Sequence, residues 1–415
     1  MFREIALKIL LAYYKEGGYL NILINNYYNE YDLSGDDRNK VTRIVYGTVQ
    51  YQIYLMYQIE PFIKRVKVFE KTLLLMSTYQ HYFMDSLPDY AIVNDAVDLA
   101  KKYKGKKTGN FINAVLNNVF THERSLEELD QLERLSIETS HPYWMVRMFE
   151  KQYGYEITRN MCLSNNEVPH QCGRVNSLLS DRTKFLNNPL YKPAILSSQG
   201  VYYLGGNIAD TREYKEGLIT VQDESSQLAA ELLKPNYQEK VLDMCGAPGS
   251  KSTHLSEFMK DEGELTVIDF YEHKINLIKE NCKRMHIHNI KVIVYDSTKL
   301  KELYDEESFD CILLDAPCSG LGDLRRKPEI RYHDSNLMDT LIPLQSELLE
   351  NAYYLLKKGG RMLYSTCTVN KKENEYQTRQ FLEKHHDLMK KEERMILPHE
   401  CGSDGFYMCL MMKGK

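Results

Sequence analysis

From about residue 220 to its end, the chain alternates short apolar runs with stretches of helical periodicity. This alternation is typical of βαβ units, in which helices cover both faces of a largely parallel sheet. The predicted strands are Lys240–Met244, Leu265–Asp269, Lys291–Tyr295, Phe309–Asp315, Arg361–Ser365 and Phe406–Met411. Helices are predicted between them at 251–260, 272–286 and 344–357, and Gly359-Gly360 is expected to end the last one. We therefore expect a doubly wound α/β domain over residues 221–415.

The first 125 residues differ, because they show helical periodicity and no strand-like alternation. Residues 126–220 are mixed, with a helical pattern over 145–165 and strand-like runs at Gln171–Leu179 and Gly200–Leu204. A chain of 415 residues is too long for one ordinary domain of about 100–200 residues. We therefore predict a multidomain protein, with an all-α domain over 1–125, a small α+β connector over 126–220 and the α/β domain after it.

Composition excludes several classes of protein. No apolar run approaches the roughly 18 residues of a membrane helix, and the first residues lack the features of a signal peptide. The nine cysteines form neither a Cys-x-x-Cys pair nor zinc-type Cys/His spacing, so we predict no structural metal and mostly buried thiols. The net charge of −5 argues weakly against nucleic acid, although local clusters matter more than the total. We expect a cytoplasmic protein without membrane contact.

One local cluster is strongly basic. Five lysines surround Tyr103 within residues 101–107: Lys101, Lys102, Lys104, Lys106 and Lys107. Lysines that neutralise phosphates release counterions, which drives most sequence-independent affinity for nucleic acid. Two interpretations stay open, namely an RNA contact and a solvated charged loop.

A nucleoside site is predicted where the strands of the α/β domain end. The first strand runs into Cys245-Gly246-Ala247-Pro248-Gly249-Ser250-Lys251, whose small residues let the backbone approach a ligand closely. Asp269, Asp296 and Asp315 end the next three strands, where a carboxylate can hold ribose hydroxyls. The loop lacks the glycine patterns of dinucleotide folds and P-loops, which disfavours hydride transfer and nucleotide hydrolysis. S-adenosylmethionine fits better, because it has no pyrophosphate; the alternative is that these acids only cap helices and solubilise loops.

Two predicted strands end in a thiol. Phe309–Asp315 is followed by Cys318, and Arg361–Ser365 is followed by Cys367. Neighbouring parallel strands bring their carboxyl ends together, so the two thiols are expected to face one cleft. Two thiols beside a nucleoside cofactor, without metal-type spacing, indicate covalent catalysis. Cytosine suits this chemistry, because a thiolate that adds to carbon 6 activates carbon 5 for methylation, while Asp315 at the N3 edge stabilises the adduct.

Three of these motifs together resemble the RNA (cytosine-5)-methyltransferases: Asp243–Lys251, Asp315–Gly320 and Ser365–Thr368. The N-terminal region is similar to the NusB-like RNA-binding domain of the RsmB (Sun, Fmu) type, which modifies 16S rRNA; the similar segments are Arg43–Val49, Ala91–Val97 and Asn110–Leu116. The region after it is similar to the connecting region of the same RsmB type, and the similar segments are His141–Trp144, Arg174–Asn176 and Val221–Gln227. The resemblance covers nearly the whole chain, and it implies a Rossmann-like class I methyltransferase domain that uses S-adenosyl-L-methionine.

The resemblance also implies roles for matching residues. Cys367 corresponds to the nucleophile and Cys318 to a second cysteine that assists product release, beside the catalytic Asp315 and Lys251. The implied cofactor contacts are Cys245, Gly246, Ala247, Pro248, Gly249, Ser250, Lys251, Asp269, Asp296 and Asp315. The family has alanine and glycine where this chain has Gly246 and Ser250, and we expect these small residues to preserve cofactor binding. RNA contacts besides the lysines are expected at Arg174, Asn176, Arg325 and Arg326; for the last two, a charged surface loop is the alternative.

We therefore expect a monomeric enzyme that methylates carbon 5 of one cytosine in 16S rRNA, in naked RNA or an early assembly particle. A base within a stem would have to be extruded, so a loop or an unfolded assembly stage is the more accessible substrate. Two alternatives stay open: a tRNA cytosine-5 methyltransferase with the same chemistry, or a ribosome-assembly or antitermination RNA-binding protein without activity. The joint presence of Cys318, Cys367, Asp315 and Lys251 argues against the last.

Overall fold

The computed structural model describes residues 1–31, 33–85 and 87–415. They form two compact units: Met1–Asn166 with Arg326–His333, and Glu167–Arg325 with Asp334–Lys415. We call them the helical unit and the α/β unit. The region predicted as a separate connector is divided between them, since its part up to Asn166 belongs to the helical unit and the rest, which contains its strands, belongs to the α/β unit.

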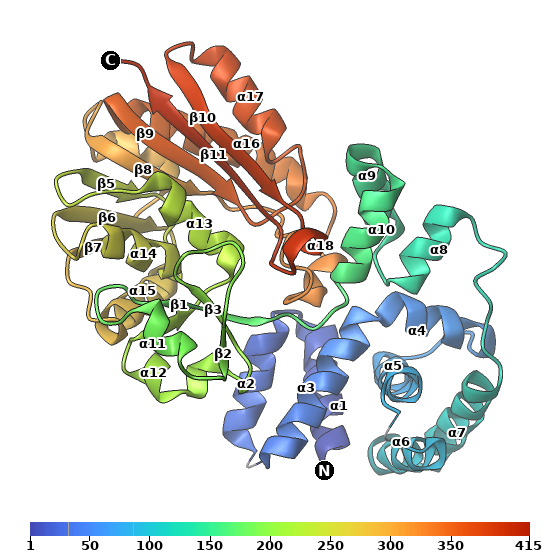
Figure 1. The fold of residues 1–415 in the computed structure, drawn as a ribbon. Coiled ribbons are helices and arrows are strands. Elements are labelled where there is room, and N and C mark those ends of the chain that lie inside the picture. The colour runs from blue at the N-terminus through green and yellow to red at the C-terminus, as the bar shows by residue number, and fades with distance from the viewer. Residues whose placement is uncertain (32, 86) are drawn as a thin grey trace. The chain divides into compact units, whose positions relative to one another are not determined.

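The helical unit is all-α in its described part, as predicted (Figure 1). Its helices are α1 Phe2–Glu16, α2 Leu20–Glu30, α3 Gly35–Gln50, α4 Gln52–Ile59, α5 Val68–Phe83, α6 Asp89–Lys104, α7 Lys106–Thr121, α8 Gln131–Glu138, α9 Tyr143–Tyr153 and α10 Tyr155–Ser164, with single turns η1 Glu60–Phe62 and η4 Pro328–Tyr332. Helix α3 begins after Ser34, whose hydroxyl accepts a hydrogen bond from the amide of Asp37. The apolar faces of α1, α5 and α7 meet in one core that includes Ile9, Leu74 and Leu116.

The segment Arg326–His333 belongs to the helical unit, although the chain before and after it belongs to the α/β unit. The Tyr332 ring packs against the helical core, and its hydroxyl donates to the carbonyl of Val49 at 2.9 Å. The amide of Leu20 donates to Glu329 at 3.1 Å. This inserted segment is therefore part of the helical unit's interior.

Arg331 fixes the inserted segment to the rest of the helical unit through several hydrogen bonds. Its side chain is fully buried within the helical unit. Its guanidinium donates to the carbonyl oxygens of Gln50, Thr139, Ser140 and Asn165 at 3.0, 3.2, 3.3 and 3.1 Å, and to Asn166 Oδ1 at 2.7 Å. It thereby joins the end of α3 to the turns that follow α8 and α10.

The α/β unit has two sheets in the part of the chain that the structure describes. The smaller is antiparallel, with the order β2-β3-β1-β4. Its strands are β1 Gln171–Val175, β2 Tyr191–Pro193, β3 Gly200–Tyr203 and β4 Ile219–Val221, with short helical segments α11 Arg182–Leu186, η2 Ile208–Asp210 and α12 Arg212–Lys215 between them. This sheet contains both strands predicted before residue 220, which begin where expected and end earlier.

The larger sheet has the order β10-β11-β9-β8-β5-β6-β7, and its strands from β9 to β7 are parallel (Figure 1). They are β5 Lys240–Asp243, β6 Glu264–Asp269, β7 Ile290–Val294, β8 Phe309–Asp315, β9 Leu356–Thr366, β10 Leu388–Ile396 and β11 Phe406–Lys413. One face packs on α13 Glu224–Leu233, α14 Ser250–Phe258 and α15 Glu272–Arg284, and the other on η3 Ser297–Glu302, α16 Leu337–Leu355 and α17 Glu375–Lys384. A short helix, α18 Pro398–Cys401, precedes β11. The predicted doubly wound α/β fold is confirmed.

Two details of this sheet differ from the prediction. Gly359-Gly360 does not end a helix, because α16 stops at Leu355 and β9 begins at Leu356. Gly359 has a φ of 77° inside β9, and the pairing register with β8 shifts between Phe309 and Cys311, so the glycine lies at a strand irregularity. Strand β10 was not predicted, because its middle, from Lys390 to Arg394, is an unbroken run of charged residues.

Candidate active site

The two predicted thiols meet at the carboxyl ends of β8 and β9. The strands pair in parallel, with Asp315 opposite Ser365. Each then turns into a loop that carries a cysteine, and the sulfur atoms of Cys318 and Cys367 lie 3.3 Å apart. This distance places the two thiols side by side, in the region where the sequence predicted them to meet.

The thiol of Cys367 is held in its neutral form. Its hydrogen bond with Cys318 and its burial both raise its pKa well above the ordinary value. Since the thiolate is the nucleophile, a proton must leave Cys367 before it can attack. The neighbouring thiol is placed to take part in that proton transfer.

Asp315 and Lys251 form an ion pair close to the thiols. Lys251 Nζ lies 2.8 Å from Asp315 Oδ2, and the Ser365 hydroxyl donates to Asp315 Oδ1 at 2.8 Å. Burial alone would lower the pKa of Lys251, but the charge of Asp315 and its hydrogen bond outweigh burial and raise it. Both carboxylate oxygens are thereby fixed in position before any substrate arrives.

The loop between β5 and α14 depends on its small residues. A Cβ at position 246 would lie 2.2 Å from Val267 Cγ1, so Gly246 is required by the valine beside it. Gly249 has a φ of 102°, a left-handed conformation that glycine adopts without strain, and α14 begins directly after it. The backbone amides at the start of α14 face the edge at which the strands end, which suits a closely bound ligand.

The predicted acids lie along one edge of the sheet, because β8, β5, β6 and β7 are neighbours. Asp269 at the end of β6 accepts hydrogen bonds from the amides of Ala247 and Tyr271 at 3.2 and 3.1 Å. Asp296 after β7 caps η3 through the amide and hydroxyl of Thr298. Asp296 therefore caps η3 and Asp269 supports the loop after β5, and both carboxylates lie at the edge where the cofactor is predicted to bind.

A carboxylate that the sequence analysis missed holds the Cys318 loop in place. Glu373 follows Cys367 by six residues in the chain and is fully buried. Its carboxylate accepts from the Ser319 amide at 2.8 Å, the Ser319 hydroxyl at 2.6 Å, Asn370 Nδ2 at 3.0 Å and Gln345 Nε2 at 3.1 Å. Glu373 therefore ties the loop after β9 to the loop after β8 and sets the spacing of the two thiols. Its only signal in the sequence was its proximity to Cys367.

Two residues predicted to contact RNA are structural instead. Arg174 is fully buried, and its guanidinium donates to Glu257 at 2.7 Å, to the Ser250 carbonyl at 2.7 Å and to Thr253 at 3.0 Å. Asn176 is also buried, and its amide donates to the carbonyls of Gly217 and Met285, each at 3.0 Å. Neither side chain can reach an RNA phosphate, so the predicted contact is corrected: Arg174 holds the first turn of α14 against the smaller sheet.

The remaining predicted RNA contacts differ in exposure. Arg325 is buried and donates to the carbonyls of Gly402 at 2.5 Å and Pro398 at 3.0 Å, which corrects its predicted role as a phosphate clamp. Arg326 is half-buried. All five lysines of residues 101–107 are exposed, and Lys102 pairs with Glu4 at 2.8 Å. The lysine cluster therefore remains accessible to RNA.

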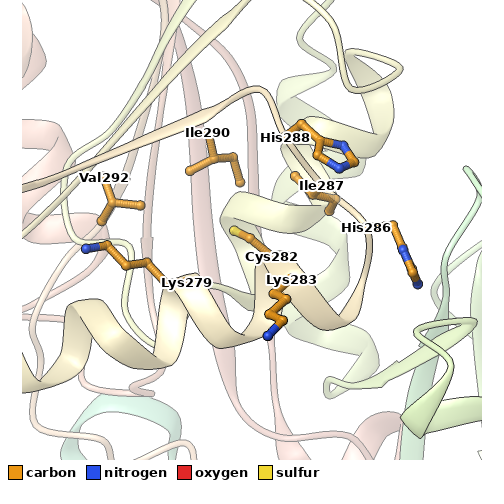
Figure 2. Close-up of a pocket in the computed structure, with 8 residues that line it drawn as sticks. All are labelled: Lys279, Cys282, Lys283, His286, Ile287, His288, Ile290 and Val292. Carbon is orange, nitrogen blue, oxygen red and sulfur yellow. The ribbon is translucent and has the colours of Figure 1, made fainter.

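A separate hollow of about 360 Å³ lies between α15 and β7 (Figure 2). Its lining comes from α15, the following turn and β7: Lys279, Cys282, Lys283, His286, Ile287, His288, Ile290 and Val292. The predicted site residues lie instead at the carboxyl ends of the strands and in the loops that follow them. No group of three or more metal-ligating side chains occurs in the described ranges, and no helix there is long and apolar enough to span a membrane.

Comparisons with known proteins now identify the family. The model for 16S rRNA methyltransferase RsmB/F matches residues 230–412, the NusB family model matches 2–121, and the ferredoxin-like domain of RsmF/B-like methyltransferases matches 141–188. A probable ribosomal RNA small subunit methyltransferase B from Bacillus subtilis is 36% identical, over 99% of this chain and 98% of its own. The chain belongs to the RsmB/F family. It is an S-adenosylmethionine-dependent 16S rRNA methyltransferase, as predicted.

Other relatives agree with this assignment to RsmB/F. Ribosomal RNA small subunit methyltransferase B from Yersinia enterocolitica is 30% identical, over 99% of this chain and 98% of its own. The crystal structure of PH0851 superposes with a TM-score of 0.86 at 25% identity, over 99% of this chain and 98% of that one. NSun6 from Pyrococcus horikoshii, at 19% identity and a TM-score of 0.61 over 66% of this chain and 98% of its own, shares the fold. The RsmB/F assignment thus holds along the whole chain.

Proposed function

We propose that this RsmB/F enzyme methylates carbon 5 of a cytosine in 16S rRNA through a covalent adduct between Cys367 and the base. The observation that carries the proposal is the 3.3 Å separation of the Cys318 and Cys367 sulfurs at the ends of paired strands. Transfer to an exocyclic amine or a ribose hydroxyl would need no pair of thiols there, whereas carbon 5 must first be activated.

The residues present fit S-adenosylmethionine, which supplies an electrophilic methyl group when bound. Gly246 and Gly249 leave the backbone after β5 open to close approach, and the first turn of α14 offers amide donors. Asp269 lies at the end of β6, where a carboxylate suits ribose hydroxyls. We assign cofactor contacts to the loop 245–251 and to Asp269, Asp296 and Asp315.

The chain's own residues then carry out the reaction as follows. Cys367 loses its proton to solvent, and its sulfur forms a bond to carbon 6 while the electron pair of the 5,6 double bond moves into the ring. Asp315 stabilises the ring at its N3 edge, and Lys251 keeps that carboxylate in place. After carbon 5 has bonded to the methyl group, Cys318, which has likewise lost its proton to solvent, takes the carbon 5 proton. The electron pair restores the double bond, the bond from carbon 6 to sulfur breaks, and Cys367 is released as a thiolate.

The test is a comparison of two cysteine variants on 16S rRNA. Cys367→Ala should abolish methylation, because no other group can open the 5,6 double bond. Cys318→Ala should instead accumulate a protein–RNA adduct that survives denaturing electrophoresis, because elimination is blocked. Cys401→Ala, which removes a partly buried thiol beside Ser403, is the matched control and should behave as wild type.

The trapped adduct also gives a test by pH. The hydrogen bond with Cys318 is the largest cause of the raised pKa of Cys367, so its loss should lower that pKa. Adduct formation by Cys318→Ala should therefore reach its maximal rate at a lower pH than methyl transfer by the wild type. An adduct trapped by Cys367→Ala would reverse the two roles, and methylation elsewhere than carbon 5, read by bisulfite sequencing, would refute the proposal.

We also propose that the enzyme acts as a cytoplasmic monomer. Every residue assigned to catalysis comes from one α/β unit of one chain, which supports catalysis without a second copy. Sedimentation of the active enzyme together with its RNA should then give a single protein per RNA.

A further inference from the structure

A chain of hydrogen bonds joins the residues that follow the two thiols. Ser319 comes directly after Cys318, and Thr368 comes directly after Cys367. Both side chains are buried, and their hydroxyl oxygens lie 2.8 Å apart. The Ser319 hydroxyl donates to the Glu373 carboxylate at 2.6 Å, so the Thr368 hydroxyl is the donor in its bond to Ser319. The chain therefore passes from the loop after β9 to the loop after β8, and returns to the loop after β9 at Glu373.

The Glu373 carboxylate holds the backbone on both sides of Cys318. Its Oε1 atom accepts from the amide of Ser319, the residue after this cysteine, at 2.8 Å. The same oxygen accepts from Gln345 Nε2 at 3.1 Å, and that nitrogen also donates to the Pro317 carbonyl at 2.9 Å. Pro317 directly precedes Cys318. One carboxylate oxygen thus fixes the residue after the cysteine directly and the residue before it through Gln345.

Cys367 depends less on this carboxylate than Cys318 does. It directly follows β9, which pairs with a strand on each side, and its carbonyl accepts from the Gly322 amide at 2.9 Å. The backbone of Glu373 is fixed to the same strand, because its carbonyl accepts from the hydroxyl of Tyr364 in β9 at 2.7 Å. Cys318 instead lies in the loop beyond β8. Loss of the carboxylate would therefore free Cys318 and leave Cys367 in place.

The Glu373 carboxylate is costly to bury. Glu373 is fully buried, and the groups that donate to it, on Ser319, Asn370 and Gln345, are neutral. Burial of a charge without an opposite charge is unfavourable unless hydrogen bonds replace its hydration. A neutral side chain could fill the same space without that cost. Because a satisfied polar network makes one geometry rigid, we attribute the charge to the geometry of the loop that it holds.

We infer that Glu373 is a positioning residue for product release, which holds Cys318 within reach of the carbon 5 proton of the methylated base. The inference rests on the proposed covalent mechanism. In the release step the Cys318 thiolate takes that proton, the electron pair restores the 5,6 double bond, and the bond from carbon 6 to the Cys367 sulfur breaks. A displaced base slows this step, whereas the attack by Cys367 comes earlier and does not depend on it.

The central test is Glu373→Gln in the full-length enzyme with S-adenosylmethionine and 16S rRNA. The variant keeps the shape of the side chain but replaces one acceptor oxygen with an NH2 group. Quenched time courses should follow methyl transfer and, by denaturing electrophoresis, the protein–RNA adduct. The first methyl transfer should keep the rate of the wild type. Decay of the adduct should slow about tenfold, so that adduct accumulates during turnover.

Variants of the hydroxyl chain test the same inference with Glu373 in place. Thr368→Val removes the hydroxyl that donates to Ser319, so it should also accumulate adduct, though less than Glu373→Gln. Thr368→Ser retains the hydroxyl and should release product as the wild type does. This pair decides the question if Glu373→Gln does not fold. The matched control is Glu375→Gln, which changes a half-buried carboxylate at the start of α17 and should not alter release.

Two results would overturn the inference. Equal losses of methyl transfer and release, with a lowered urea midpoint, would give Glu373 a purely structural role. Release at the wild-type rate in both Glu373→Gln and Thr368→Val would show that Cys318 does not depend on this network. Cys318→Ala, measured alongside, separates the two proposals. If it traps adduct and Glu373→Gln does not, only the positioning role fails; if it traps none, the covalent mechanism itself fails.

Discussion

Two arginines are fully buried, one in each unit, and they are held in different ways. Arg174 in the α/β unit faces a carboxylate, Glu257, at 2.7 Å. Arg331 in the helical unit is surrounded by four backbone carbonyls and the amide oxygen of Asn166. Burial lowers the pKa of both guanidinium groups, and in Arg174 the charge of Glu257 opposes that effect. The positive charge of Arg174 is compensated by the negative charge of Glu257, whereas the charge of Arg331 is compensated by the dipoles of neutral carbonyl groups.

The difference follows from what each arginine joins. Arg174 links side chains and the Ser250 carbonyl at the start of α14, so its site can include a carboxylate from that helix. Arg331 joins chain turns whose carbonyls lie at helix ends, and a guanidinium supplies enough donors for several of them. Removing Arg174 would therefore leave a buried charge, whereas removing Arg331 would leave only neutral acceptors.

The largest expected effect is that of Arg174→Met. It leaves Glu257 buried without its cation, which should cost about 3–5 kcal/mol of unfolding free energy. Urea denaturation measures this cost. The double variant Arg174→Met with Glu257→Leu should recover most of it, because a buried ion pair can be replaced by apolar side chains at little cost. A double variant no more stable than the single would show that Glu257 does not depend on Arg174.

Arg331→Met should have a smaller effect, about 1–3 kcal/mol, because it leaves carbonyls rather than a charge without partners. The urea midpoint measures it under the same conditions. Arg331→Lys is the informative companion: a single ammonium cannot reach all five acceptors, so it should recover only part of the stability. If Arg331→Met cost more than Arg174→Met, the distinction between ionic and dipolar compensation would be refuted.

The lysines of residues 101–107 give the smallest effect on stability, since all are exposed. Replacing the five with glutamine should change the unfolding free energy by less than about 0.5 kcal/mol. It should weaken RNA binding and flatten its salt dependence by roughly 0.7 in log–log slope for each phosphate that a lysine no longer neutralises. Replacement of the exposed Lys64, Arg65 and Lys67 is the control. An unchanged slope would assign the cluster to solvent.

The juxtaposition of the Cys318 and Cys367 thiols was predictable because their signals are local. Each cysteine follows a strand that its apolar run reveals, and parallel strands fix where their ends meet. The family, the cofactor and the α/β fold followed from the same motifs. The spacing of motifs in the sequence was therefore enough to predict most of the residues that lie at the carboxyl ends of the strands in the larger sheet.

The buried arginines were not predictable, because their partners are distant in the sequence. Arg174 and Glu257 are 83 residues apart, so nothing near Arg174 indicated a buried ion pair. The charged run before Arg331 was interpreted either as an RNA clamp or as a charged surface loop, whereas the burial of Arg331 depends on carbonyls 166 to 281 residues away. Glu373 was missed for the same reason, since Ser319 and Gln345, which donate hydrogen bonds to it, lie 54 and 28 residues away in the sequence. Contacts between side chains from distant segments of the sequence can be identified only from the three-dimensional structure.

The inserted segment has a consequence for the order in which the protein is made. Helices α1 to α10 leave the ribosome early, but Arg331 and Tyr332 follow only after β8 has been synthesised. Until then the carbonyls that Arg331 will bind must be solvated. Domains generally fold as units as the chain emerges. Here the helical unit is synthesised first, but it cannot be completed until the inserted segment has been translated, after most of the α/β unit.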